Sequence, residues 1–447
     1  MSSPAYLFES ASAIAGLIVS GEVSCVEVVE AHLDRIHAVN PRLNAVVTFA
    51  ADRAREEAIM ADKALATGKT LGPLHGVPIT IKDSFDTEGI ISTASTEGRR
   101  QFVPSEDATT VARLRAAGAI LLGKTNTPEI TIGAATESPL FGRTNNPYDQ
   151  AYTPSGSSGG AAAILAAGGS ALEMGSDTGG SIREPAHVCG IVGLKPTAGL
   201  VPRTGHGLPP GLGVTDFITQ VGPMARFTDD IALALELISG VDWKDTATVP
   251  ASLSKPADPS RLKVAMHTHN GVVDPHPDVA RAVLAARDAL SSQGVNVRED
   301  VPAAIAEHRD IYARMRNADG GHSVRHVLSQ WGTRTPGEGL AQRLGEASSV
   351  AIGDFIDLFI EIDAFKRSML EFMQNYDAIL CPPSAHPPLE HSDWGETRYD
   401  EWTFLSSFNL TGWPALVLRA GTTDSGLPLG VQIVGRPFQD HHVIELA

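Results

Sequence analysis

A glycine-rich stretch over residues 133–222 constrains the fold more than any other part of this sequence. A flexible linker is also rich in glycine, but here apolar runs interrupt the stretch at residues 161–167, 171–174 and 188–194. Glycine placed among buried runs indicates tight turns, where backbone comes close to backbone or to a ligand. We therefore predict that this stretch belongs to the core of the fold.

Two other segments share a pattern in which an amphipathic helix precedes a short apolar strand. In the first, Ser105 is the candidate N-cap of the helix and residues 119–122 are the strand. In the second, apolar residues at helical spacing over 279–290 precede a strand at 295–297. Helices that alternate with short apolar strands are typical of an α/β layered fold.

The charge of the chain argues against two classes of partner. Its 447 residues carry a formal net charge of -17. Binding to nucleic acid depends on Lys and Arg side chains that meet phosphates, and an anionic membrane surface attracts the same residues. We therefore expect no nucleic acid and no membrane among the partners.

Neither the cysteines nor the N-terminal residues indicate a disulfide framework, a zinc site or export. Cys25, Cys189 and Cys381 are far apart, odd in number and form no CxxC pair. The mildly apolar residues 11–20 are too short for a membrane span and lack the basic flank of a signal peptide. Histidines and acidic residues show no ligand spacing, so we expect no metal and no other cofactor. The expected location is the cytoplasm.

Lys82 opens the first of three segments with candidate chemistry. Residues 77–81 are a short run rich in β-branched side chains, which predicts a strand that places Lys82 at its end. A lysine that acts as a base must be neutral, and burial would lower its pKa. The neighbours Ile79 and Ile81 are consistent with burial, although a lysine taken alone is more often at the surface.

The second segment is a run of small residues from Thr153 to Gly160, followed by an alanine-rich helix. The N–H groups of such a loop can face a reacting carbonyl, but on pattern alone a capped helix start is favoured. Residues 156–160 also match the G-x-S-x-G spelling of a nucleophile elbow, with Ser158 as the nucleophile. Because an elbow follows a strand directly, and the preceding residues make a poor strand, we reject this interpretation.

In the third segment, a short apolar run meets Gly179, Gly180 and Ser181, and a helix is expected to begin near Pro185. The two glycines impose no Cβ, so backbone N–H groups of residues 177–181 could converge on one point. Convergent N–H donors are what an oxyanion hole requires, although an ordinary tight turn has the same pattern.

Together the three segments resemble the amidase signature family, over nearly the whole chain. Residues 76–83 look like the lysine motif of that family, residues 156–160 like its Gly/Ser motif, and residues 175–185 like its nucleophile block. Supporting blocks follow in the family's order at 124–129, 189–197, 222–224, 409–412 and 426–432. The resemblance implies an α/β fold with a central mixed, twisted β-sheet covered by helices on both faces.

The resemblance also implies the residues of the site. The triad would consist of Lys82 as base, Ser157 as proton relay and Ser181 as nucleophile. The Gly156–Ser157 peptide would be cis, and the oxyanion hole would be formed by the backbone N–H groups of Thr178, Gly179, Gly180 and Ser181. This sequence departs from the usual pattern at Ser155, Ser176 and Glu184, and Glu184 puts the ordinary substrate preference in doubt.

The expected organisation is one amidase-type domain over residues 1–447. Its parts are a helical N-terminal region at 1–70, a catalytic core at 71–243, a more helical variable segment at 262–375 and a return to the core at 376–447. We expect a monomer or homodimer that takes a small-molecule amide or carbamate as substrate.

The reaction implied is hydrolysis of a C–N bond through an acyl-enzyme, with possible resemblance to the carbamate-cleaving urethanases of the family. One alternative is the glutaminase-type component of an amidotransferase, which supplies ammonia to misacylated tRNA. Another is a binding protein on the same fold without catalysis, which the presence of all three catalytic side chains disfavours. The substrate pocket is expected from residues 136–152, 205–217, 311–360 and 383–413, which contain Tyr148, Phe217, Tyr312, Trp331, Trp394, Trp402 and Trp413.

Overall fold

One large β-sheet gathers strands from both ends of the chain. The computed structural model describes residues 4–393, 400 and 402–447. The sheet has 11 strands in the order β1-β3-β2-β6-β8-β7-β12-β13-β11-β9-β10, with parallel and antiparallel neighbours. A separate hairpin pairs β4 with β5. The strands are β1 (Val46–Phe49), β2 (Pro78–Lys82), β3 (Ile120–Thr125), β4 (Glu137–Ser138), β5 (Gly142–Arg143), β6 (Leu172–Asp177), β7 (Val192–Lys195), β8 (Gln220–Ala225), β9 (Lys263–Met266), β10 (Asn296–Glu299), β11 (Ala378–Cys381), β12 (Ala415–Thr422) and β13 (Pro428–Gly435).

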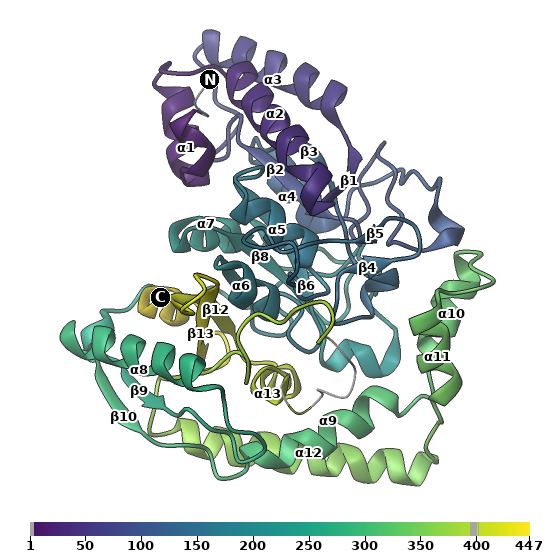
Figure 1. Cartoon of the computed structure of the whole chain (residues 1–447), viewed down its shortest axis with the longest axis vertical. Coiled ribbons are helices and arrows are strands. Elements are labelled where there is room, and N and C mark those ends of the chain that lie inside the picture. The colour runs from purple at the N-terminus through teal and green to yellow at the C-terminus, as the bar shows by residue number, and fades with distance from the viewer. Residues whose placement is uncertain (1–3, 394–399, 401) are drawn as a thin grey trace.

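Helices cover both faces of this sheet, as the resemblance implied (Figure 1). The α-helices are α1 (Ala11–Val19), α2 (Cys25–Leu43), α3 (Ala51–Ala66), α4 (Thr109–Ala116), α5 (Gly159–Ala166), α6 (Arg183–Cys189), α7 (Thr228–Ile238), α8 (Pro277–Ser292), α9 (His308–Asn317), α10 (His322–Gln330), α11 (Glu338–Glu346), α12 (Ile352–Met373), α13 (Thr403–Thr411) and α14 (Asp440–Leu446). Short 3-10 turns are η1 (Ala5–Phe8), η2 (Glu97–Arg99), η3 (Glu129–Thr131), η4 (Gly213–Phe217), η5 (Pro259–Arg261) and η6 (Ile305–Glu307).

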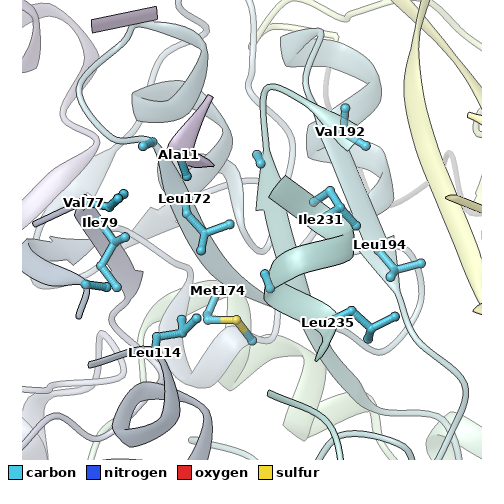
Figure 2. Packing of buried hydrophobic residues seen from close by; sticks show 14 of the residues in the cluster. Ala11, Val77, Ile79, Leu114, Leu172, Met174, Val192, Leu194, Ile231 and Leu235 are labelled. Carbon is cyan, nitrogen blue, oxygen red and sulfur yellow. The ribbon is translucent and has the colours of Figure 1, made fainter. Parts of the chain in front are cut away.

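The packing of α7 defines one face of the sheet. Ile231 and Leu235 of α7 lie beside Leu194 of β7 and share one buried cluster with Leu172 of β6, and all four are fully or almost fully buried (Figure 2). A fully buried leucine or isoleucine contributes about 1.5–3 kcal/mol through the hydrophobic effect. This layer therefore fixes the central strands from one side.

The opposite face is packed by α5 and α6. Ala161 of α5 and Ala186 of α6 belong to one buried cluster with Met224 of β8 and Val417 of β12. Small side chains on these two helices let them come close to the sheet and to each other. Both helices begin directly after the loops that carry Ser157 and Ser181, so their packing positions those loops.

Strand β2 covers Pro78–Lys82, one residue later than the run at 77–81, and it ends at Lys82 as predicted; all five of its residues are buried. It runs parallel to β6. The carboxyl ends of adjacent parallel strands meet at the same edge of a sheet. Lys82, the last residue of β2, therefore lies beside Ser176 and Asp177, the last residues of β6.

The prediction that Ser105 caps the following helix is wrong. Helix α4 begins at Thr109, with Ala108 in an extended conformation as its N-cap. Residues 107 and 108 are tied instead to the preceding loop, since the Ala108 N–H donates to the Asp86 carbonyl and the Glu88 N–H donates to the Asp107 carboxylate. These contacts delay the first helical turn by several residues.

No helix in the described part of the chain is both long and apolar enough to cross a membrane.

Candidate active site

Lys82 is buried and surrounded by serine hydroxyl groups. Its Nζ lies 2.7 Å from Ser157 Oγ, 2.9 Å from Ser158 Oγ and 2.9 Å from Ser176 Oγ. The Ser158 hydroxyl lies 3.4 Å from the Ser176 carbonyl oxygen, to which it donates its own hydrogen. Ser158 is therefore an acceptor for Lys82, whereas Ser157 keeps a hydrogen that it can give away.

Burial lowers the pKa of Lys82 from 10.5 to about 7. A charged ammonium loses its hydration when it is buried, which favours the neutral amine. The carboxylates of Asp177 and Glu173 act in the opposite direction but do not cancel the effect of burial. Burial thus favours a neutral Lys82 near neutral pH.

The loop before α5 brings Ser157 to Lys82. The Gly156–Ser157 peptide bond is cis, as the resemblance implied. Ser158 is the N-cap residue of α5, and its N–H donates to the Ser181 carbonyl over 3.1 Å. This hydrogen bond ties the Gly/Ser loop to the loop of the candidate nucleophile. Among the strands of the described residues, none runs directly into Gly156, consistent with rejection of the elbow interpretation.

Ser181 follows β6 on a tight turn and lines a cavity. Gly180 has a φ of 124°, a conformation that favours glycine. The Gly180 N–H donates to Asp177 Oδ1 over 2.8 Å, so it is already occupied. Among the four N–H groups expected to form an oxyanion hole, those of Thr178, Gly179 and Ser181 have no such hydrogen bond within the described residues.

A buried ion pair holds this turn in place. Arg183 Nε lies 3.0 Å from Asp177 Oδ2 and Arg183 Nη2 lies 2.9 Å from Asp177 Oδ1, which makes a bidentate contact. Both side chains are fully buried. The Arg183 guanidinium and surrounding hydrogen bonds outweigh burial and hold the pKa of Asp177 far below its usual range. The carboxylate therefore remains charged.

Two side chains from the C-terminal part of the chain complete this network. Arg183 Nη1 donates to Gln432 Oε1 over 2.7 Å, and Arg183 Nη2 donates to Asn409 Oδ1 over 2.6 Å. Asn409 Nδ2 donates in turn to Asp177 Oδ1 over 2.9 Å. Asn409 and Gln432 lie in the supporting blocks of the sequence, but their role was not predicted from it.

The cavity in front of Ser181 has a volume of ≈ 120 Å³ and opens into a groove of ≈ 1080 Å³. Residues 178–181 form one wall. The other walls come from the predicted ranges 205–217, 311–360 and 383–413, and also from residues 131–134, which were not predicted. Residues 137–139, from the predicted range 136–152, line the outer groove.

The aromatic residues proposed for the pocket separate into two groups. Tyr312 and Trp402 line the cavity, and the Tyr312 hydroxyl donates to the Thr178 carbonyl over 2.9 Å. The others contact different parts of the chain: Tyr148 is beside Arg419, Phe217 packs on Phe359, Trp331 lies over Arg99, and Trp413 is in the core. Trp394 lies outside the described residues.

The three departures from the family pattern have different surroundings. Ser176 supplies one of the hydroxyls around Lys82. Ser155 donates to the Ala134 carbonyl over 3.3 Å. Glu184 lines the cavity, is almost fully buried, and has one carboxylate oxygen 3.9 Å from His386 Nε2. A carboxyl group three residues after Ser181 is thus part of the cavity wall.

Sequence reasoning missed Asp177, Arg183 and the third hydroxyl at Ser158. The signal available was an aspartate and an arginine six residues apart, on either side of the Gly-Gly-Ser turn, since charged residues are rarely buried unless paired. For metals, the described residues contain no group of three His, Cys, Asp or Glu side chains able to hold an ion.

Comparisons with known proteins place nearly the whole chain among amidases. The family model described as Amidase matches residues 27–444. A glutamyl-tRNA(Gln) amidotransferase subunit from Roseiflexus sp. (strain RS-1) is 36% identical over 461 residues, which cover 96% of this chain and 93% of the relative. A solved 6-aminohexanoate cyclic dimer hydrolase in complex with its substrate is 30% identical, with a TM-score of 0.86 and coverage of 98% of this chain and 96% of the other. A bacterial aryl acylamidase of the amidase signature family is 25% identical, with a TM-score of 0.85 and coverage of 98% and 94%.

Proposed function

This chain belongs to the amidase signature family of enzymes that act on carbon–nitrogen bonds, and we propose that it hydrolyses an amide with Ser181 as nucleophile, Ser157 as proton relay and Lys82 as base. The observation that carries the proposal is the buried Lys82 Nζ, 2.7 Å from Ser157 Oγ, in a loop that is tied to the turn of Ser181. A lysine with a pKa of about 7 is a suitable base at neutral pH.

Acylation begins with two proton transfers. A neutral amine has two N–H groups and one lone pair, so Lys82 can donate to Ser158 and Ser176 while it accepts the hydrogen of Ser157. Ser157 then takes the proton of Ser181, whose oxygen attacks the substrate carbonyl carbon. The free N–H groups of Thr178, Gly179 and Ser181 would stabilise the oxyanion.

Collapse of the tetrahedral intermediate requires that the leaving nitrogen first receive a proton. An amine anion is a poor leaving group, so Ser157 passes a proton to the departing nitrogen and is reprotonated by the Lys82 ammonium. The C–N bond breaks and the acyl group remains on Ser181. Water then attacks this ester and gives its proton to Ser157, whose own proton passes to Lys82. When the second tetrahedral intermediate collapses, Ser157 protonates the departing Ser181 oxygen and is reprotonated by Lys82, which releases the carboxylic acid and restores Ser181.

The experiment that tests the proposal combines labelling with a substrate panel. A fluorophosphonate should label Ser181 alone, and mass spectrometry of the digested protein identifies the site. The panel contains an aryl amide, a primary amide and an aryl carbamate, and the carbamate is included because sequence resemblance extends to urethanases. Labelling at a residue other than Ser181, or amide hydrolysis that persists without Ser181, would overturn the assignment.

A second candidate function is supported by the relatives named as subunits of glutamyl-tRNA(Gln) amidotransferase, one of which matches 96% of this chain at 36% identity. In that case the physiological substrate is glutamine, and the ammonia released serves an amidotransferase. Ammonia release from free glutamine distinguishes the two candidates. If the purified chain releases ammonia from glutamine faster than it cleaves any amide of the panel, the second candidate replaces the first.

A further inference from the structure

Four charged side chains line the cavity in front of Ser181: Glu184, Arg316, Asp319 and Arg343. Three of them already have interactions within the protein. Asp319 accepts from the Gly321 N–H over 2.8 Å and from the Ser323 N–H over 2.9 Å, while Glu184 and Arg343 have partners of their own. The fourth, Arg316, has no hydrogen bond or ion pair to any residue that the structure describes.

The position of Arg316 relates it directly to the reacting centre. It lies on α9 four residues after Tyr312, and residues at this spacing share one face of a helix. The Tyr312 hydroxyl contacts the Thr178 carbonyl in the wall that contains the oxyanion N–H groups. Four residues along a helix span about 6 Å, so Arg316 lies roughly one helical turn from Tyr312.

Arg316 also lines both the inner cavity and the outer groove, and is therefore located where one opens into the other. Its side chain is only partly exposed. A partly buried guanidinium without a protein partner is suited to a planar anion, because its N–H groups form two parallel hydrogen bonds to a carboxylate. The surrounding apolar wall, which includes Leu340 and Leu344, weakens competition from water.

We propose that Arg316 is a specificity-determining residue that binds a carboxylate of the substrate, several bonds away from the scissile carbonyl. The substrate class is then an amide that carries a second, anionic carboxyl group, such as the mono-amide of a dicarboxylic acid. This inference rests on the proposed function, since it assumes that the scissile carbonyl is placed at Ser181.

The test uses pairs of anilides that differ only in charge. Glutaranilic acid carries a terminal carboxylate, and pentananilide has the same acyl chain length without it. Binding of both compounds is measured by calorimetry to the Ser181→Ala protein, in which the substrate stays intact. We expect glutaranilic acid to bind at least tenfold more tightly than pentananilide, and the difference to shrink at high salt.

Arg316→Gln and a matched control locate the effect. In the Ser181→Ala background, Arg316→Gln should weaken binding of glutaranilic acid by about 10- to 100-fold, the range for hydrogen bonds to charged groups, and should remove the preference over pentananilide. Arg314→Gln is the control, because Arg314 is on the same helix but is paired with Glu361, 3.0 Å away, outside the cavity. The control should keep the preference.

Failure of this inference is distinguishable from failure of the proposed function. The role of Arg316 would be overturned if the Ser181→Ala protein, with Arg316 intact, bound glutaranilic acid no more tightly than pentananilide. A preference for glutaranilic acid that survives Arg316→Gln would overturn it as well. Aniline release from either compound by the protein with Ser181 intact, and its loss in Ser181→Ala, reports separately on the proposed reaction.

Discussion

At the scale of single residues, the environment of Lys82 determines what the site can do. A buried lysine beside a carboxylate would be held as an ammonium, but the groups in contact with Lys82 are hydroxyls of Ser157, Ser158 and Ser176. Hydroxyls solvate the neutral amine as well as the charged one. The charge of Lys82 is therefore decided mainly by burial, which brings its pKa to about 7.

We expect kcat/KM to rise with pH through an ionisation near 7 and then stay level into the mildly alkaline range. Below that pH Lys82 is an ammonium and cannot accept the Ser157 proton, and above it the neutral amine is the active form. The acidic limb should disappear in the residual activity of Lys82→Ala. Lys195 is the matched control, because burial also lowers its pKa to about 7 but it donates to the Pro196 carbonyl. An acidic limb that persists in Lys82→Ala and shifts in Lys195→Met would mean that Lys82 is not the titrating base.

Alanine substitutions should separate the three triad residues from their neighbours. Ser181→Ala is expected to abolish turnover, and Lys82→Ala and Ser157→Ala should each lower kcat by about 10²–10⁴-fold, the usual contribution of acid–base groups. The Lys82→Ala/Ser157→Ala double variant should lose little more, since the two residues act as one unit. Ser158→Ala should lose much less, because its hydrogen goes to the Ser176 carbonyl. Steady-state kinetics on one anilide measures all five, and additive losses in the double variant would contradict the relay.

At the scale of elements, side chains of two helices hold the Ser181 turn. Arg183, the first residue of α6, binds Asp177 at the end of β6. Tyr312 of α9 binds the Thr178 carbonyl. The turn contains Gly179 and Gly180 and gains rigidity from these neighbours rather than from its own backbone.

Loss of the Arg183 guanidinium should destabilise the protein strongly. Arg183→Met leaves the Asp177 carboxylate buried without its partner, which costs about 3–5 kcal/mol in the free energy of unfolding. Arg367→Met is the control, since the ion pair of Arg367 with Asp363 is exposed and such pairs contribute about 0–1 kcal/mol. Urea denaturation at neutral pH measures both. Similar midpoints for the two variants would mean that the buried pair does not hold the turn.

The contact between Gly179 and α9 predicts a pair of coupled variants. A Cβ added at Gly179 would lie 2.3 Å from the Tyr312 hydroxyl oxygen and 3.2 Å from its Cζ, so Gly179→Ala should displace the turn and lower kcat/KM. Tyr312→Phe removes the nearer of these atoms. The Gly179→Ala/Tyr312→Phe double variant should therefore recover part of the activity lost in Gly179→Ala. A double-mutant cycle on kcat/KM tests this, and purely additive losses would contradict it.

The elements also show where sequence reasoning succeeds and where it fails. The strand ending at Lys82 was predictable because residues 77–81 form one continuous run rich in β-branched side chains. The cap of α4 was misplaced because Ala108 is held by Asp86, a contact that no local pattern reveals. The network of Arg183 depends on Asn409 and Gln432, which are 226 and 249 residues away along the chain. Such partners become visible only when the fold brings them together.

At the scale of the whole molecule, the part of the chain that carries the proposed catalytic residues is distinct from the part that forms much of the cavity wall. The proposed catalytic residues lie between positions 82 and 181, at the end of strand β2 and in the loops that precede α5 and α6. Helices α9 to α11 and the loops between them contribute much of the opposing cavity wall and lie at the border of the molecule (Figure 1). The sheet then continues through β11 to β13.

The proposed reaction uses only side-chain and backbone groups of this chain, so dialysis against a chelator should leave the rate unchanged. The physical reason is that Lys82 and Ser157 carry the protons and backbone N–H groups stabilise the oxyanion, without a Lewis acid. Initial rates before and after dialysis, with and without added divalent ions, provide the measurement. Activity that is lost on dialysis and restored by one ion would require a different mechanism.

The placement of α9 to α11 has a consequence for how this enzyme could diversify. Residues 308–346 follow the edge strand β10 and precede β11, and none of the sheet's strands falls within them. An insertion, deletion or exchange here that keeps Tyr312, which contacts the Thr178 carbonyl, would alter the shape and charge of the entrance while Lys82, Ser157 and Ser181 keep their mutual geometry. Natural selection, or a laboratory library confined to these residues, could therefore change the substrate preference while the catalytic residues stay the same.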